Sequence, residues 1–451
     1  MTTAVPHSEI NNPLSQTHYV NRLTSAADRI AIYAQEDIVS AQGLKLVAAG
    51  SQITSGMRER LSQHKLNQPL ENTVQVGDSS VFDRLHKEAE KLLDERRDLH
   101  PLFNWQRASL KPLDTMSQIR PTRHALSALS LLEQSEGFGL AHSALVCLTA
   151  LGVGARLDRS PSDLQELTHA AIFHDVGQLY VDPVWFSKGR QLTPSEWKHI
   201  AIHPIVGAQV LEQYLGFKPQ TAQIVLESHE RADQSGYPRR RSASALGSIL
   251  AFAEQISGIA ARHVDNLPRL TVSVKVLPTE HPREILSAFL QAFQEATVDT
   301  EIKISTDPAD FTAELHHFFV RIAHTLTVLA HLENANSLNV TGNKNSVGKI
   351  IEQSKIRFDH IQRAFSCTGL DMAAHQPELM DELQRGLESV EARVVLDELL
   401  WRLSELSRDI HLRAEHLSVV ESEVLEPLID ALGGSYTSHP QESLNQSVDL
   451  F

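Results

Sequence analysis

The sequence predicts a mainly α-helical protein, with a small α+β module at its N-terminus and a helical region at its C-terminus. Two observations favour helices: start signatures with a capping residue and a proline recur through the middle of the chain, and leucines recur at three- and four-residue steps near its end. Of the 451 residues, 41% are hydrophobic and only 6% aromatic. A chain of this length and composition is expected to fold into roughly two to four well-buried domains.

Residues 1–80 are expected to form the α+β module. Asp37–Val39 and Leu44–Val47 look like two short strands around the turn Ala41-Gln42-Gly43, and a short helix is expected from Thr54 to Leu66. Residues 81–116 begin with acids and bases alternating at helical spacing, which predicts a solvated connector helix. This N-terminal part carries no pattern that indicates catalysis.

Residues 117–266 are predicted to be an all-helical bundle whose helix starts are unusually clear. Ser160-Pro161-Ser162-Asp163 offers a cap, a proline at the first helical position and an acid at the third, and Thr193-Pro194-Ser195-Glu196 repeats the arrangement. The first of these helices is expected to run through His174 and stop at Gly177. The second is expected to end near His203, because Pro204 disturbs it.

The remaining chain is expected to be helical with two interruptions. A helical extension is predicted for 267–332, beginning with a β-like stretch at Thr271–Val276, and the Asn-, Ser- and Gly-rich residues 333–346 indicate a flexible linker. Residues 347–435 are predicted to form a helical bundle or hairpin suited to dimerisation or contact with a signalling partner, followed by a disordered tail at 436–451.

Composition narrows the possible partners and the compartment. A net charge of −15 argues against duplex nucleic acid, although a local basic pocket for a small phosphate ligand is compatible with it. Two cysteines provide no disulfide framework. The N-terminus lacks the features of a signal peptide, and the longest apolar run, about Ala144 to Ala155, is shorter than the ~20 residues that cross a bilayer. We therefore expect a cytoplasmic protein without a membrane span.

Two stretches carry chemistry: Phe173-His174-Asp175-Val176-Gly177 and Ser228–Pro238, which contains Gly236-Tyr237-Pro238. An adjacent His and Asp can supply a nitrogen ligand and a bridging carboxylate to divalent metals, and the second stretch offers an imidazole beside a rigid turn. Together they resemble the HD-GYP family, metal-dependent phosphodiesterases of the HD superfamily that open cyclic di-GMP. The resemblance covers about Leu140 to Arg262 and implies the HD-superfamily helical bundle for this region.

The resemblance also implies roles for particular residues. His174 and Asp175 would be the catalytic pair, with Asp175 as the bridge between two metals. The implied metal ligands are His142, His174, Asp175, His203, His229 and Glu254, and the implied substrate contacts are Gln178, Arg231, Gly236, Tyr237, Pro238 and Arg239. Because the ligands are imidazoles and carboxylates without thiolates, iron or manganese is expected, and two such ions can together activate a water for attack on phosphorus.

Several positions depart from the family's pattern. Gln178 stands where the family has lysine, Ser228 where it has histidine, and Glu254 where it has aspartate, while Phe138 replaces the glutamate of three-metal members. The favoured hypothesis is a phosphodiesterase acting on cyclic di-GMP. The alternatives are a catalytically degenerate domain that binds cyclic di-GMP or a protein partner, and an HD phosphohydrolase with another nucleotide substrate.

Overall fold

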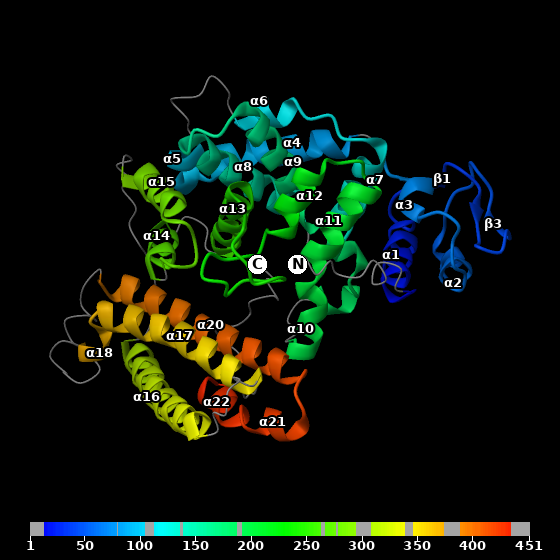
Figure 1. Cartoon of the computed structure of the whole chain (residues 1–451). Coiled ribbons are helices and arrows are strands. Elements are labelled where there is room, and N and C mark those ends of the chain that lie inside the picture. Colours follow the sequence, from blue (N-terminus) through cyan, green and yellow to red (C-terminus); the bar gives the residue numbers. More distant parts are fainter. Residues whose placement is uncertain are drawn as a thin grey trace.

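The computed structural model describes residues 13–78, 80–103, 112–135, 139–186, 192–262, 267–276, 278–294, 308–338, 346–373 and 388–433. Within these ranges the chain is helical apart from four short strands, which confirms the predicted fold class (Figure 1). None of the helices in the same ranges is long and apolar enough to cross a membrane.

The N-terminal module combines helices with two small antiparallel sheets. Strand β1 pairs with β4, and β2 pairs with β3 through Ile38 opposite Val47, so the predicted strands around the Gly43 turn are confirmed. Between Thr54 and Leu66 the helix is limited to η1 and α2. The elements are α1 Pro13–Ala26, β1 Ile32–Ala34, β2 Ile38–Val39, β3 Lys45–Val47, η1 Ser55–Met57, α2 Arg58–Ser62, α3 Leu70–Thr73 and β4 Val74–Val76.

The central bundle is built around α8 Leu140–Arg156, which is buried along most of its length and packs against α4, α9 and α13. Its apolar residues belong to one continuous core with those of the N-terminal module. The other elements are α4 Val81–Glu95, η2 Arg97–Leu99, α5 His100–Phe103, α6 Pro112–Ser117, α7 Arg123–Glu133, α9 Pro161–Phe173, η3 His174–Tyr180, η4 Pro183–Phe186, α10 Pro194–Ala201, α11 His203–Gln213, α12 Pro219–Leu226, α13 Ala245–Arg262 and α15 Arg283–Gln294.

Both predicted helix starts are present. The Ser160 hydroxyl accepts a hydrogen bond from the Asp163 amide at 3.1 Å, and Thr193 forms a reciprocal capping box with Glu196. The end of α9 differs from the prediction: the α-helix stops at Phe173, and residues 174–180 form the 3₁₀ helix η3. A Cβ at Gly177 would collide with the carbonyl oxygen of His203, so glycine lets η3 lie directly against α11.

The C-terminal region has its own core, formed by α16, α17, α20 and α22 together with part of α14. The predicted leucine pattern is confirmed, since Leu396, Leu399, Leu403 and Leu406 are all fully buried. The elements are α14 Leu267–Val276, α16 Pro308–Leu338, α17 Ser346–Cys367, α18 Leu370–Ala373, α20 Glu388–Ala414, α21 Val419–Glu423 and α22 Glu426–Ala431.

Two expectations for this region were wrong. Thr271–Val276 is not β-like but part of helix α14. This helix packs on two sides: Leu270 and Val274 lie in the core of the central bundle, and Val272 and Val276 lie in the core of the C-terminal region. The predicted linker 333–346 overlaps α16, which continues to Leu338. Residues 339–345 of that linker and the predicted tail 436–451 lie outside the described residues.

Candidate metal centre

The six predicted metal ligands come from five segments that meet inside the central bundle. His142 lies in the first turn of α8, His174 and Asp175 open η3, His203 opens α11, His229 follows α12, and Glu254 lies in the middle of α13. Because η3 begins where α9 ends, the His-Asp pair is presented at a helix junction. His174, Asp175, His203 and Glu254 are buried, whereas His142 and His229 are partly exposed, which places the ligand set in the interior and at the edge of the bundle.

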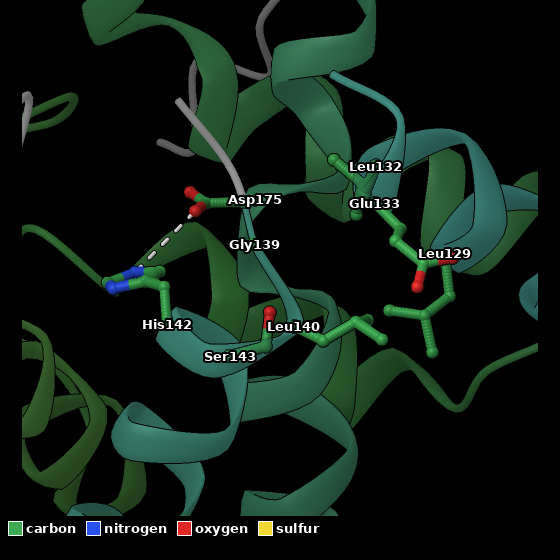
Figure 2. Close-up of a pocket in the computed structure, with 8 residues that line it drawn as sticks. All are labelled: Leu129, Leu132, Glu133, Gly139, Leu140, His142, Ser143 and Asp175. Carbon is green, nitrogen blue, oxygen red and sulfur yellow. Dashed lines mark ion pairs between the residues drawn. The ribbon is translucent and has the colours of Figure 1, made fainter. Parts of the chain in front are cut away.

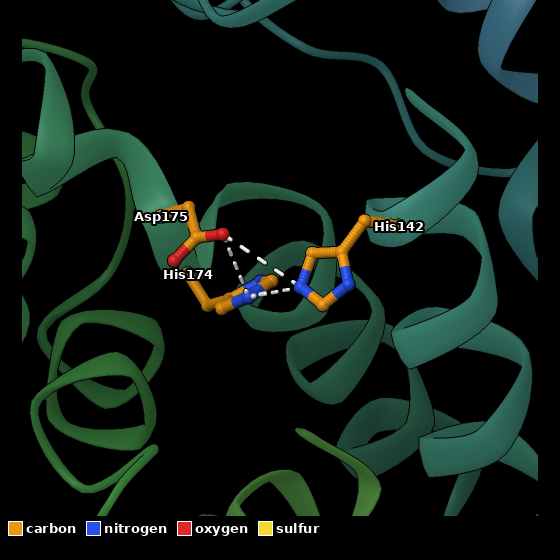
Figure 3. A group of neighbouring side chains, drawn as sticks. All are labelled: His142, His174 and Asp175. Carbon is orange, nitrogen blue, oxygen red and sulfur yellow. Dashed lines mark hydrogen bonds and ion pairs between the residues drawn. The ribbon is translucent and has the colours of Figure 1, made fainter. Parts of the chain in front are cut away.

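His142, His174 and Asp175 form the tightest group (Figure 3). The Nε2 atoms of the two histidines are 3.2 Å apart, and Asp175 Oδ2 lies 3.2 Å from His174 Nε2 and 3.7 Å from His142 Nε2. Glu254 Oε2 approaches the same two nitrogens, at 3.1 Å from His174 and 3.4 Å from His142. The longer carboxylate at position 254 therefore reaches the group.

The second oxygen of Asp175 faces a different histidine. Asp175 Oδ1 lies 3.6 Å from His203 Nε2, and the rings of His203 and His229 are 4.9 Å apart between centroids. The two oxygens of this carboxylate thus lie near different imidazoles, Oδ2 near those of His142 and His174 and Oδ1 near that of His203.

Unsatisfied polar atoms indicate that a metal fits these residues. His203 Nε2, His229 Nε2 and Glu254 Oε1 are buried and have no hydrogen-bond partner among the described residues. Leaving such a group unpaired costs about 1–3 kcal/mol, and more when the group is charged. His174 and His203 each donate Nδ1–H to a carbonyl, of Ala171 at 2.8 Å and of Ile200 at 2.9 Å. These bonds direct the Nε2 atoms of both rings at the cluster.

The electrostatics of the site separate neutral imidazoles from charged groups. Burial lowers the pKa of His203, and burial together with His203 lowers the pKa of His229 to about 3, so both are neutral at pH 7. Burial also opposes the charged form of His174, but Asp175 and Glu254 outweigh it and raise its pKa well above the ordinary value. Burial likewise opposes ionisation of Glu254, yet His142 and His174 hold its pKa well below the usual range.

The positions that depart from the family's pattern lie at the cluster. Gln178 is buried in η3, its Nε2 donates to Asp175 Oδ1, and its Oε1 has no hydrogen-bond partner among the described residues. Ser228 is fully buried next to His229, and its hydroxyl also lacks a partner within the described part of the chain. Gln178 thus orients the carboxylate of Asp175 but supplies no positive charge. Phe138 lies outside the described residues.

The signature loop packs back onto His229. The Tyr237 amide donates to the His229 carbonyl at 2.9 Å, and the two rings stack with centroids 4.6 Å apart. A Cβ at Gly236 would collide with that same carbonyl oxygen, so the loop requires glycine there. Pro238 continues the loop from Tyr237. Gly236 and Tyr237 therefore lie beside the cluster.

The two predicted phosphate-binding arginines are engaged by protein carboxylates. Arg231 Nη1 lies 2.8 Å from Glu405 Oε2, and Arg239 lies 3.4 Å from Glu227. Their role in substrate binding stays a prediction. Sequence reasoning missed Glu230, whose carboxylate accepts hydrogen bonds from the amides of Arg239 at 2.6 Å and Arg241 at 2.9 Å. The only signal in the sequence for this role was the position of Glu230 within the stretch Ser228–Pro238.

A small pocket opens beside His142 and Asp175 (Figure 2). Its volume is about 10 Å³, close to the ~10–15 Å³ that one water requires. It is therefore large enough for a water and far too small for a nucleotide. The lining residues are Leu129, Leu132, Glu133, Gly139, Leu140, His142, Ser143 and Asp175.

Comparison with known families decides the class of the central bundle: a model of the HD domain matches residues 128–268. These residues are an HD domain. The match overlaps the predicted domain 117–266 and contains all six candidate ligands.

Curated relatives match only part of this chain. The chain is 30% identical over 118 residues to a cyclic di-GMP phosphodiesterase of Pseudomonas aeruginosa, which is 26% of this chain and 28% of that protein. It is 29% identical over 150 residues to a cyclic di-GMP phosphodiesterase of Thermotoga maritima, 32% of this chain and 39% of that protein. It is 28% identical over 109 residues to a 3′3′-cGAMP-specific phosphodiesterase of Vibrio cholerae, 24% of each. The chain thus spans about a quarter to two fifths of these relatives, and no solved structure matches it.

Proposed function

We propose that the HD domain is a divalent-metal-dependent phosphodiesterase that hydrolyses a cyclic dinucleotide, with cyclic di-GMP as its substrate. The observation that supports this best is the convergence of unsatisfied ligand atoms, from His203, His229 and Glu254, around the two-sided carboxylate of Asp175. Helices α11 and α13, the turn after α12 and the 3₁₀ helix η3 position these atoms, and their burial is costly without a cation.

The residues divide into two groups of ligands. His142, His174 and Glu254 would hold one ion with Asp175 Oδ2, and His203 and His229 would hold a second with Asp175 Oδ1. The donor set suits iron or manganese. When bound, such ions supply an activated water and neutralise charge on the phosphate. The chain itself orients the imidazoles through their Nδ1 hydrogen bonds and fixes Asp175 through Gln178.

Substrate contacts are proposed for Gln178 and the signature loop. Tyr237 lies against His229, so its ring borders the ligand cluster and offers a face to a base. Gly236 and Pro238 fix this loop, and Arg231 and Arg239 would reach phosphate only after leaving their present carboxylates. Because the pocket beside His142 is too small for a nucleotide, substrate entry requires the site to open.

The test is turnover measured together with metal content. Purified protein, loaded with Mn²⁺ or Fe²⁺ under reducing conditions, is incubated with cyclic di-GMP and, separately, with 3′3′-cGAMP, and the products are separated by chromatography. We expect linear dinucleotide or GMP from cyclic di-GMP. Both metal binding and turnover should be lost in His174→Ala and Asp175→Ala but kept in His316→Ala, which removes an exposed imidazole of α16. Metal-loaded protein that leaves both dinucleotides intact would exclude the enzymatic proposal.

A second candidate function is binding without turnover. It is favoured by Ser228 and Gln178, because the first is a poor metal ligand and the second lacks the charge that would stabilise the attacked phosphate. In that case equilibrium dialysis should show cyclic di-GMP binding without product, and the double variant Ser228→His, Gln178→Lys should gain turnover. The cytoplasmic location and the homodimer through the C-terminal helices stay predictions.

A further inference from the structure

Helix α20 presents an apolar face and a charged face that follow directly from its sequence. Leu399, Leu403, Leu406 and Ile410 recur at three- and four-residue steps and are buried in the second core. A second set of residues, mostly charged, lies on the side of α20 that faces the HD domain, where α20 contacts α10 and the arginines in and after the signature loop (Figure 1). This set is Trp401, Arg402, Glu405, Arg408, Asp409 and Arg413.

Two carboxylates of this face are surrounded by arginines. Asp409 forms ion pairs with Arg240, with Arg357 at 3.1 Å and with Arg413 at 3.9 Å. Glu405 pairs with Arg231 at 2.8 Å, with Arg357 at 3.8 Å and with Arg408 at 3.9 Å. We define the arginine cluster as Arg231, Arg240, Arg357, Arg408 and Arg413.

The arginine cluster carries more positive charge than its own carboxylates neutralise. Among the described residues five guanidinium groups share Glu405 and Asp409, and Asp233 adds a third negative charge near Arg231. The nearby Glu280, 3.9 Å from Arg231, is engaged by Arg402 at 3.0 and 3.1 Å. The cluster is partly buried, with side chains 13% to 37% exposed. Such a cationic surplus is notable in a chain with a net charge of −15. Guanidinium groups left without full compensation in a half-buried site favour an added anion.

The backbone around Arg240 is held in an uncommon conformation that delivers its side chain to the cluster. Arg240 has a φ of +54°, in the left-handed region that residues with a Cβ rarely adopt. Glu230 fixes the loop by accepting hydrogen bonds from the amides on either side, Arg239 and Arg241. A conformation that costs energy and is held from both sides is typical of a functional position.

Aromatic rings border the arginine cluster. Arg408 lies over the Trp197 ring at 4.1 Å, and Trp197 meets Tyr237 of the signature loop edge to face. Trp401 lies beside Arg231 and is 42% exposed. Phosphate-binding guanidinium groups next to an accessible indole provide the two contacts that a nucleotide needs, one for its phosphates and one for its base.

We propose that the arginine cluster is a second anion site, which binds the phosphate groups of a nucleotide where the HD domain meets the C-terminal region. Arg231 and Arg240 belong to the HD domain, and Arg357, Arg408 and Arg413 belong to the C-terminal region, so the ligand bridges the two. Glu405 and Asp409 hold the guanidinium groups in place. When phosphate binds, it replaces part of these ion pairs, because a phosphate can accept two parallel hydrogen bonds from one guanidinium group. The site needs no metal, and it shares only Arg231 with the proposed substrate contacts of the HD domain.

The test is calorimetric titration of the full chain after metal removal with EDTA, using cyclic di-GMP, GMP and inorganic pyrophosphate as separate probes. We expect cyclic di-GMP to bind, and Arg357→Gln and Arg413→Gln each to weaken its affinity at least about tenfold, because each removes charge-assisted hydrogen bonds. Arg393→Gln is the matched control: it breaks the pairs of Arg393 with Glu314 at 2.8 Å and Asp397 at 3.1 Å, within the C-terminal region. It should leave affinity unchanged, as should His174→Ala.

Three results would overturn the proposal. Affinity lost in His174→Ala but kept in Arg357→Gln would place the ligand in the metal centre. Pyrophosphate, GMP and cyclic di-GMP binding with equal affinity would leave only unspecific attraction of anions. An equal loss of affinity in Arg393→Gln would indicate a general effect on the C-terminal region. Circular dichroism of each variant shows whether a loss of affinity is due to misfolding, and Arg357→Lys provides a milder substitution at the same position. Since turnover is measured on metal-loaded protein, its failure and the failure of this site are distinguishable.

Discussion

Glu254 Oε2 lies 3.1 Å from His174 Nε2, inside the core of the HD domain. The sequence left open whether a glutamate could replace the aspartate of the HD-GYP pattern, because its extra methylene displaces the carboxylate. The contact answers this for the metal-free protein: α13 places the longer side chain so that its carboxylate meets the same imidazoles as Asp175. The glutamate therefore keeps the charge that a cation would need at this point.

Replacing Glu254 tests its contribution to the metal centre directly. Glu254→Gln keeps the shape but removes a buried negative charge, so we expect Mn²⁺ affinity to fall by 10–100-fold or more. Titration calorimetry on metal-free protein measures the change. Glu423→Gln, which neutralises an exposed carboxylate of α21, is the control and should bind Mn²⁺ as the natural chain does. Unchanged affinity in Glu254→Gln would remove Glu254 from the ligand set.

The signature loop contains a residue whose conformation suits glycine. Gln234 has a φ of +64°, where a side chain costs roughly 1–2 kcal/mol. Gln234→Gly should therefore raise the free energy of unfolding by about 1 kcal/mol, offset in part by the greater freedom of glycine in the unfolded chain. Urea denaturation measures this. Ser242→Gly, at an exposed position without positive φ, should instead lower stability slightly, and the same sign in both variants would contradict the argument.

Glu280 connects the HD domain to α20 through a buried ion pair. Its carboxylate accepts hydrogen bonds from Arg402 Nε at 3.0 Å and Nη2 at 3.1 Å, and both side chains are almost fully buried. Glu280→Gln leaves the buried guanidinium of Arg402 with Glu398 as its remaining carboxylate partner, so we expect a loss of about 1–3 kcal/mol in the free energy of unfolding. Glu284→Gln, on the exposed side of α15, should change stability by less than about 0.5 kcal/mol. A similar small effect in Glu280→Gln would mean that solvent reaches the pair.

His281 should make the protein sensitive to acid. Burial lowers its pKa to about 4, only partly opposed by Glu280, whereas the unfolded value is about 6.5. The unfolded state therefore binds the proton first, so the stability due to neutral His281 is present above pH 6.5 and is lost as the pH falls toward 4. The loss reaches up to about 3 kcal/mol. Denaturation of metal-free protein at pH 7 and pH 5 should show a smaller pH effect in His281→Gln than in the natural chain. The same pH effect in both, or an equal reduction in the exposed control His316→Gln, would contradict this role.

Helix caps and the positions of the candidate ligands could be predicted from the sequence, because each depends on residues only a few positions apart. Caps at Ser160 and Thr193 act within one helical turn, and the ligand residues occupy fixed places in the family's pattern. The β-like interpretation of Thr271–Val276 failed because β-branched residues there are accommodated by packing on both sides of a helix. The contacts of Arg231 could not be predicted, since its partner Glu405 is 174 positions away and no pattern links the two.

Helix α14 has a practical consequence for dissecting this chain. Leu270 and Val274 pack into one hydrophobic core, and Val272 and Val276 pack into the other. A truncation anywhere inside α14 would therefore remove packing residues from both cores. A fragment ending at the predicted boundary after residue 266 also loses α15, whose Ile285 and Phe289 pack into the interior of the HD domain. A fragment meant to contain the intact HD domain should therefore extend at least through Gln294. Without the C-terminal region, Val272 and Val276 of α14 would be exposed to solvent, and polar replacements at these two positions would be needed to keep the fragment soluble.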